Sequence, residues 1–315
     1  MKNILLKIAN LLYINVQYME NYGLLNGKMG AILFFYEYSR YSGNEVYNDF
    51  ADRMLDEMLD AIEAKKVDGS FGLEYGLGGI GWGIQYLIDH HFIEEDSEDV
   101  LSDFDKRMQE NIKGLSCYPF ADLRKYLSDN EFYLGIDSYI YARRLRTPKY
   151  NIDNLKEIAD FYYKVLNDNS VFPMQFLNTC YLFLLMNNPI MKGKYTLLLR
   201  NRLKEAYQET ISQKRYTCSD LKVMQRLLNE GKTVLDFSDI IMNAGQNGEC
   251  TSDVEVYLRC AKIELLSFDS HYEMLDAKVI DDYLDKGMED MPSCNLSLGE
   301  GVAGLGLFTI KALQL

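Results

Sequence analysis

The sequence predicts an all-α protein of about seven inner and seven outer helices, arranged in two concentric layers. Three observations predict this fold: apolar residues recur at helical spacing, the alternation typical of strands is hard to find, and a glycine motif returns before apolar segments. The 315 residues are 48% hydrophobic and 25% charged, which is ordinary for a globular protein. We expect a single domain over residues 1–315.

Two kinds of predicted helix alternate along the chain. Amphipathic segments carry apolar residues on one face and acidic residues on the other, as in residues 49–62, 155–166 and 272–288. Between them lie more uniformly apolar segments, at residues 31–38, 80–88, 176–186 and 305–313. Half-exposed helices that alternate with nearly buried ones predict two concentric layers. The first segment, residues 1–16, is interrupted by Lys7 and Asn10 and is predicted to be an amphipathic helix, not a signal peptide.

A GxxG motif marks the start of the predicted inner helices. Three copies superpose without a gap: Gly27 with Gly30, Gly78 with Gly81, and Gly301 with Gly304. A fourth copy begins at Gly135, with Ser138 in the second place, and weaker equivalents begin near residues 174, 218 and 250. These starts predict seven helix pairs, although the irregular spacing after residue 218 also allows six.

Glycine-rich helix starts have two interpretations. They can bind phosphate through free backbone N–H groups, or they can let neighbouring backbones pack closely because glycine has no side chain. No predicted strand precedes these glycines and no Gly-Lys-Ser/Thr sequence follows them, so the dinucleotide and Walker patterns are not met. Close packing is therefore the favoured interpretation.

The charge and the cysteines narrow the class of function. A net charge of −14 and a pI near 4.8 argue against binding to nucleic acid or to an anionic membrane. No segment reaches the roughly 18 consecutive apolar residues that a membrane span needs. Six scattered cysteines without a CxxC pair indicate reduced thiols and a cytoplasmic location.

Three segments together resemble lanthionine synthetase C-like (LanC-like) proteins: residues 23–30, 76–83 and 297–306. The resemblance covers nearly the whole chain and implies an α/α toroid of seven inner and seven outer helices. Cyclases of this family use a zinc ion to activate a peptide cysteine thiolate, which adds to a dehydrated serine or threonine. The resemblance implies zinc ligands at two places: a Trp-Cys-x-Gly sequence at the fifth inner helix and a Cys-His-Gly sequence at the sixth.

The implied zinc ligands are incomplete in this chain. Cys218, within Thr-Cys-Ser-Asp, and Cys250, within Glu-Cys-Thr-Ser, take the places of the family's two cysteines. Thr251 stands where the family has its histidine, and a threonine hydroxyl is a poor substitute for imidazole. Cys294, just before the seventh inner helix, is the best candidate for a further ligand. Zinc binding is possible on this basis, but buried free cysteines without metal are the favoured interpretation.

The remaining candidates for chemistry are histidines and carboxylates. His90 and His91 end the second inner helix, where a histidine more often offsets the helix dipole than binds a metal, and His271 is a candidate cap. The family places an aspartate four residues before the GxxG of its third inner helix, and Glu131 stands in this place as the candidate acid or base. A helix-start glutamate that favours the dipole is the alternative interpretation.

Three functions follow, in decreasing order of support. The first is a degenerate, non-catalytic LanC-like protein that binds a peptide or supports a peptide-modifying enzyme. The second is an active zinc-dependent thioether cyclase, with Cys294 or water completing the metal site. The third is a carbohydrate-active toroid enzyme, which needs two carboxylates facing each other. Its candidates near helix starts are Glu74, Glu131, Asp220, Asp253 and Glu300.

Overall fold

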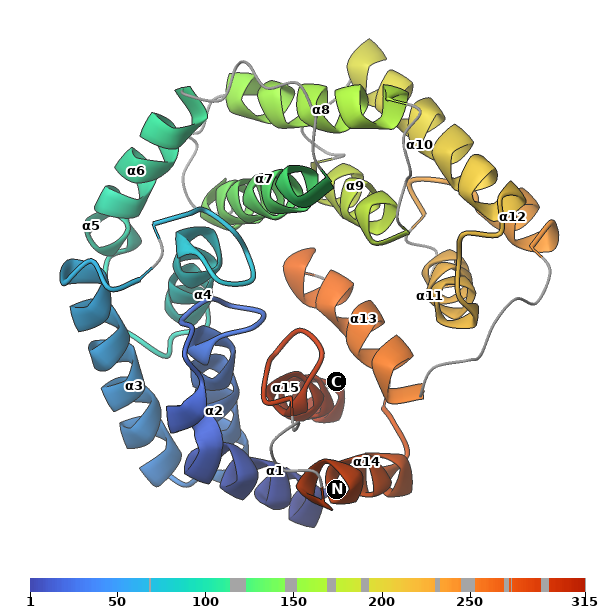
Figure 1. The fold of residues 1–315 in the computed structure, drawn as a ribbon. Coiled ribbons are helices and arrows are strands. Elements are labelled where there is room, and N and C mark those ends of the chain that lie inside the picture. The colour runs from blue at the N-terminus through green and yellow to red at the C-terminus, as the bar shows by residue number, and fades with distance from the viewer. Residues whose placement is uncertain are drawn as a thin grey trace. The chain divides into compact units, whose positions relative to one another are not determined.

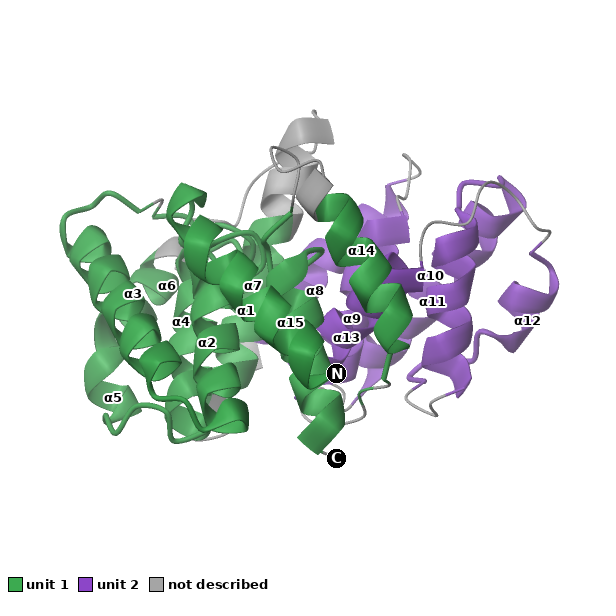
Figure 2. Ribbon diagram, turned by 90° about the horizontal axis from the view of Figure 1, so that it is seen from below, with its two compact units in different colours: residues 1–146, 270–315 green, residues 147–269 purple. Residues whose placement is uncertain are grey.

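The computed structural model describes residues 1–67, 69–113, 123–144, 152–168, 174–187, 193–229, 233–244, 253–268, 272, 274–289 and 295–314. In these ranges all regular structure is helical and no strand occurs (Figure 1), which confirms the all-α class. The chain divides into two compact units, residues 1–146 with 270–315 and residues 147–269 (Figure 2). A single domain over residues 1–315 stays a prediction.

Unit 1 contains helices from both ends of the chain. They are α1 (Lys2–Asn15), η1 (Val16–Tyr18), α2 (Lys28–Ser42), α3 (Val46–Glu63), α4 (Leu77–Asp89), α5 (Ser97–Val100), α6 (Ser102–Lys113), α7 (Leu123–Arg144), α14 (Ala277–Glu289) and α15 (Val302–Gln314). Helices α2, α4 and α15 are buried along most of their length, whereas α3 buries one face. Helix α15 contacts α2, α2 contacts α4, and α4 contacts α7, while α3 packs on α2 and α1 on α15. This arrangement agrees with the predicted alternation of buried and half-exposed helices.

Unit 2 contains the middle of the chain. Its helices are α8 (Ile152–Asn167), α9 (Met174–Asn187), α10 (Lys194–Ser212), α11 (Cys218–Asn229), α12 (Ser238–Met242) and α13 (Asp253–Leu266). Helix α10 packs against α8, α9 and α12, and α11 packs against α12 and α13. Helices α9 and α13 are the most buried of these.

The predicted helix pairs correspond closely to the observed elements. The predicted inner helices are α2, α4, α7, α9, α11, α13 and α15, and the segments before them contain α1, α3, α6, α8, α10, α12 and α14. Two predicted boundaries are wrong, apart from the start of α4 that is described next. Gly135 lies inside α7 and does not begin a helix, and α14 begins at Ala277, not near residue 272. Asp276 sets the start of α14, because its carboxylate accepts a hydrogen bond from the Lys278 N–H at 2.7 Å.

The loops that lead into α2, α4 and α15 share one hydrogen-bond pattern. In each, the first helical N–H donates to the carbonyl seven residues earlier: Lys28 to Asn21 at 2.9 Å, Leu77 to Ser70 at 2.7 Å, and Val302 to Asn295 at 2.9 Å. The pattern makes Gly27, Gly76 and Gly301 equivalent. The copy in α4 therefore begins at Gly76, two residues before Gly78, and the predicted register was wrong there. Because glycines occur at both registers, the GxxG pattern alone does not distinguish the two alignments.

The repeat glycines are required because the loop folds back onto the helix start. A Cβ atom on Gly76 would lie 2.5 Å from the Ser70 carbonyl oxygen, and one on Gly301 would overlap the Asn295 carbonyl oxygen. Neither oxygen can move away, since each accepts the hydrogen bond that closes its loop. Glycine at these positions is thus set by a close backbone approach.

The corrected register reveals a leucine three residues before each repeat glycine. Leu24, Leu73 and Leu298 are all fully buried. The side chain of Leu298 lies against Gly30 of α2, and that of Leu24 lies against Gly79 of α4, with no space for a Cβ atom at either glycine. Leu298 and Leu24 therefore each pack on the second glycine of a neighbouring helix, which joins neighbouring repeats.

Candidate functional site

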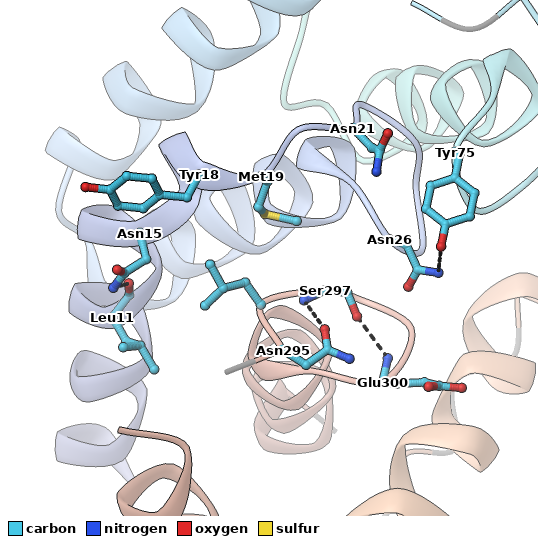
Figure 3. A pocket seen from close by; sticks show the side chains of 11 residues that line it. Leu11, Asn15, Tyr18, Met19, Asn21, Asn26, Tyr75, Asn295, Ser297 and Glu300 are labelled. Atoms are coloured by element: carbon cyan, nitrogen blue, oxygen red, sulfur yellow. Dashed lines mark hydrogen bonds between the residues drawn. The ribbon is translucent and has the colours of Figure 1, made fainter. Parts of the chain in front are cut away.

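A pocket of about 760 Å³ opens in unit 1 where the repeated loops meet α1 and η1 (Figure 3). Its lining residues are mostly uncharged and polar: Leu11, Asn15, Tyr18, Met19, Asn21, Asn26, Tyr75, Asn295, Leu296, Ser297 and Glu300. This volume is in the usual range for small-ligand sites. Sequence reasoning did not find the pocket, apart from Glu300 as a candidate carboxylate.

Equivalent positions of the three loops line this pocket. Asn26, Tyr75 and Glu300 each stand immediately before the repeat glycine of their loop. The buried leucines and the glycines hold the loop backbones in one conformation, while these neighbouring residues differ in chemistry. The signal was present in the sequence as a Gly/Ser-Leu-x-x-Gly-x-x-Gly pattern, but the register error at α4 concealed it.

Hydrogen bonds hold the pocket side chains in place. The Asn26 amide nitrogen donates to the Glu74 carboxylate at 3.0 Å and to the Tyr75 hydroxyl at 3.1 Å. On the opposite loop, the Asn295 side-chain oxygen accepts from the Ser297 N–H at 3.0 Å. The pocket wall is thus tied down by contacts within and between the loops.

Glu131, the candidate acid or base, supports the loop that carries Tyr75. Its Oε1 atom accepts hydrogen bonds from the backbone N–H groups of Glu74 at 2.9 Å and Tyr75 at 3.3 Å. Gly135 lies one turn further along the same face of α7, where a Cβ atom would overlap the Phe71 carbonyl oxygen. Both residues hold α7 against this loop, so the geometry describes Glu131 as a positioning residue. A catalytic role for it stays a prediction.

The candidate zinc ligands lie only partly within the described residues. Cys250 and Cys294, together with Thr251, lie outside them. Cys218 begins α11 and is disulfide-bonded. A sulfur in a disulfide is not the thiolate that zinc binds. The expectation of reduced thiols agrees with Cys180 and Cys260, which form no disulfide, but not with Cys218.

A salt bridge joins the two helices that the resemblance expects a metal to join. Nη2 of Arg259, on α13, lies 2.6 Å from Oδ1 of Asp220, in the first turn of α11. The other carboxylate oxygen of Asp220 accepts from the backbone N–H and the hydroxyl of Thr217, at 2.8 and 2.9 Å. Asp220 replaces the glycine of the family sequence, and both oxygens of its carboxylate have partners within unit 2.

The described members of this donor set do not by themselves form a zinc site. Among the described residues, no group of three or more His, Cys, Asp or Glu side chains is arranged to hold a metal ion. Cys218 offers no thiolate, and Asp220 is neutralised by a guanidinium that would repel a dication. We therefore derive no chemical step through a metal.

Two other candidates, Asp253 and His90, contact neighbouring protein groups. Asp253 pairs with Lys222 at 2.9 Å, so this carboxylate also links α13 to α11. His90 is the C-cap residue of α4, at the end of the helix opposite Gly76, and its Nδ1 lies 2.9 Å from the Tyr86 carbonyl oxygen. Burial lowers the pKa of His90 from its ordinary value of 6.5, so the imidazole is neutral near pH 7. It does not offset the helix dipole as a cation. His271 lies outside the described residues.

Within the described part of the chain, no helix combines the length and apolar character needed to cross a membrane. Comparisons with curated proteins and with solved structures returned no match. The family model described as lanthionine synthetase C-like protein matches residues 18–181, a little over half of the 315 residues. The matched range includes α2, α4 and α7, with the loops before α2 and α4, and ends before α11. The chain belongs to the lanthionine synthetase C-like family.

Proposed function

We propose that this protein is a LanC-like peptide-binding protein that does not catalyse zinc-dependent thioether formation. The observation that carries the proposal is the Arg259–Asp220 salt bridge between α13 and α11. A fixed positive charge reaches Asp220 in the first turn of α11, two residues after the disulfide-bonded Cys218. An ion pair thus provides the link between these helices that the family resemblance assigns to a metal.

The pocket in unit 1 supports the peptide-binding part of the proposal. Amide side chains such as those of Asn21, Asn26 and Asn295 can donate and accept hydrogen bonds, as a peptide backbone does. Tyr75 adds an aromatic surface, and its side chain is 40% exposed. A pocket lined by such polar and aromatic side chains can bind a peptide without catalysing a reaction.

Metal content tests the non-catalytic part. We expect elemental analysis of protein purified without added metal to find no stoichiometric zinc, and a chelator to leave the unfolding curve unchanged. Stoichiometric zinc that is lost in Cys218→Ala would contradict the proposal. The zinc measurement should be made both with and without a reducing agent, so that Cys218 is also examined as a reduced thiol.

Thiol counting tests for residual catalysis. A peptide that contains one cysteine and one dehydroalanine keeps its mass on cyclisation, because the thiol adds across the double bond. Alkylation followed by mass spectrometry therefore reports the reaction. We expect the peptide thiol to remain fully alkylated after incubation with protein and zinc, at the level of a control without protein.

Peptide binding is tested through a pocket variant. Tyr75→Ala should weaken the binding of fluorescently labelled peptides, measured by anisotropy. Tyr13→Ala is the matched control, because Tyr13 is 42% exposed and does not line the pocket. Peptides that bind equally to both variants would contradict the assignment of the pocket as the peptide site.

A further inference from the structure

We propose that the pocket in unit 1 selects a lysine or arginine side chain of the bound peptide. This inference rests on the proposed peptide binding and adds the chemical class of the residue recognised. It is argued from the hydrogen-bonding capacity left in the pocket, from the exposed tyrosines, and from the charges of the lining residues.

Two side-chain oxygens of the pocket remain as hydrogen-bond acceptors. The Asn15 amide nitrogen already donates to the Leu11 carbonyl at 2.8 Å, which leaves its side-chain oxygen as an acceptor. The Asn26 amide nitrogen donates to two partners, which likewise leaves its oxygen. Lysine and arginine side chains are donors only, so these oxygens match them.

Glu300 supplies the negative charge. Its carboxylate is exposed in the pocket and forms no ion pair with any described residue. Its backbone N–H donates to the Ser297 hydroxyl at 3.3 Å, which holds the residue at the pocket rim. Hydrogen bonds between a cationic donor and a carboxylate are about twice as strong as neutral ones. None of the lining residues is a lysine, arginine or histidine, so no cation competes for this site.

Two tyrosines offer surfaces for the rest of such a side chain. Tyr18 is 73% exposed and Tyr75 is 40% exposed, and both line the pocket together with Met19. An aromatic face attracts ammonium and guanidinium groups, and it covers the aliphatic part of a long side chain. The net charge of −14 also raises the local concentration of cationic ligands. An anionic ligand would instead be repelled by the Glu300 carboxylate and by the net negative charge.

Three capped peptides test the inference: Ac-Ala-Ala-Lys-Ala-Ala-NH2 and the same peptide with glutamine or glutamate in the centre. We expect isothermal titration calorimetry to give at least about tenfold tighter binding for the lysine peptide than for the glutamine peptide. Glu300→Gln should remove this difference. Glu57→Gln is the matched control, because Glu57 is exposed on α3, outside the pocket, and the variant has the same net charge. It should bind as the unmodified protein does.

Each other outcome has a definite meaning. Equal affinity for all three peptides would overturn the cation selectivity but leave the proposed peptide binding intact, whereas no binding of any peptide would overturn both. Equal weakening by Glu57→Gln and Glu300→Gln would show general charge attraction and overturn the pocket assignment. An uncapped alanine peptide that binds as tightly as the capped lysine peptide would show that an N-terminal ammonium is recognised, and would overturn the side-chain assignment.

Discussion

Lys311 of α15 lies with its Nζ atom 2.5 Å from Oε1 of Glu37, an α2 residue that is only 1% exposed. The hydroxyl of Tyr86, on α4, donates to the same carboxylate oxygen at 2.6 Å. Each of the three residues stands ten positions after its repeat glycine, which are Gly27 for Glu37, Gly76 for Tyr86 and Gly301 for Lys311. One repeat position thus brings an acid, a hydroxyl and a base together inside unit 1.

Removal of Lys311 should leave the Glu37 carboxylate buried without its cation. We expect Lys311→Met to lower the free energy of unfolding by roughly 3 kcal/mol, measured by urea denaturation. The double variant Lys311→Met with Glu37→Gln should recover part of this loss, because no buried charge remains. Lys7→Met is the control, since Lys7 pairs with the more exposed Asp281 and should change stability by less than about 1 kcal/mol. Additive effects in the double variant would contradict the coupling.

The Asp220–Arg259 pair should behave in the same way in unit 2. The side chains of Asp220 and Arg259 are 10% and 15% exposed. If one partner is removed, water can therefore solvate the remaining charge only weakly. We expect Asp220→Asn to destabilise the protein by about 2–3 kcal/mol, and Asp220→Asn with Arg259→Met to cost less than the sum of the single changes. Asp253→Asn, which breaks the exposed pair with Lys222, should have an effect below about 1 kcal/mol. Equal effects in Asp220→Asn and Asp253→Asn would show that burial of the pair is unimportant.

Gly135→Ala should be among the most damaging small changes in the chain. The added methyl group would overlap the Phe71 carbonyl oxygen, and backbone atoms of α7 and of the loop would have to separate. We expect a loss of about 3 kcal/mol or more, measured as a lower urea midpoint. Gly69→Ala is the matched control, because a Cβ atom there has no neighbour within 4 Å. Comparable stability of the two variants would contradict the close approach.

Glu131→Gln should loosen the loop before α4 without unfolding the helix. Glutamine keeps an oxygen acceptor but loses the charge that strengthens the bonds to the Glu74 and Tyr75 N–H groups. We expect hydrogen exchange to increase in residues 72–76 and the free energy of unfolding to fall by about 1 kcal/mol. Unchanged exchange in this segment would show that Glu131 does not position the loop.

The sequence predicted the helices of this fold well, because their signals are local. The apolar spacing of α3 and the glycines before α2 and α15 depend only on nearby residues, and both were identified. The start of α4 was misplaced because glycine at Gly76 and at Gly78 satisfies the same local pattern. The hydrogen bond from the Leu77 N–H to the Ser70 carbonyl oxygen distinguishes them, as does Leu73, three residues before Gly76.

The candidate site was harder to predict, because its residues are neighbours only in the folded chain. Asn26 and Tyr75 meet across 49 positions, and Arg259 reaches Asp220 across 39. No spacing rule links such pairs, and asparagine and tyrosine carry no distinctive signal by themselves. Glu131 was selected as a candidate acid or base, which stays a prediction, and sequence alone could not show that its partners are backbone N–H groups.

His90 should make the protein less stable in acid. Burial is the largest cause that lowers its pKa in the folded protein from the ordinary value of 6.5, and its Nδ1 faces the Tyr86 carbonyl oxygen. Between the two pKa values the unfolded chain binds more protons than the folded one, so stability falls as the pH drops below about 6.5 and the loss levels off below the folded-state pKa. We expect the decrease in unfolding free energy from pH 7.5 to pH 5.5 to be smaller in His90→Gln than in the unmodified protein. An NMR titration that placed the pKa of the His90 imidazole above 6.5 would reverse this sign, and the decrease in unfolding free energy from pH 7.5 to pH 5.5 would then be larger in His90→Gln than in the unmodified protein.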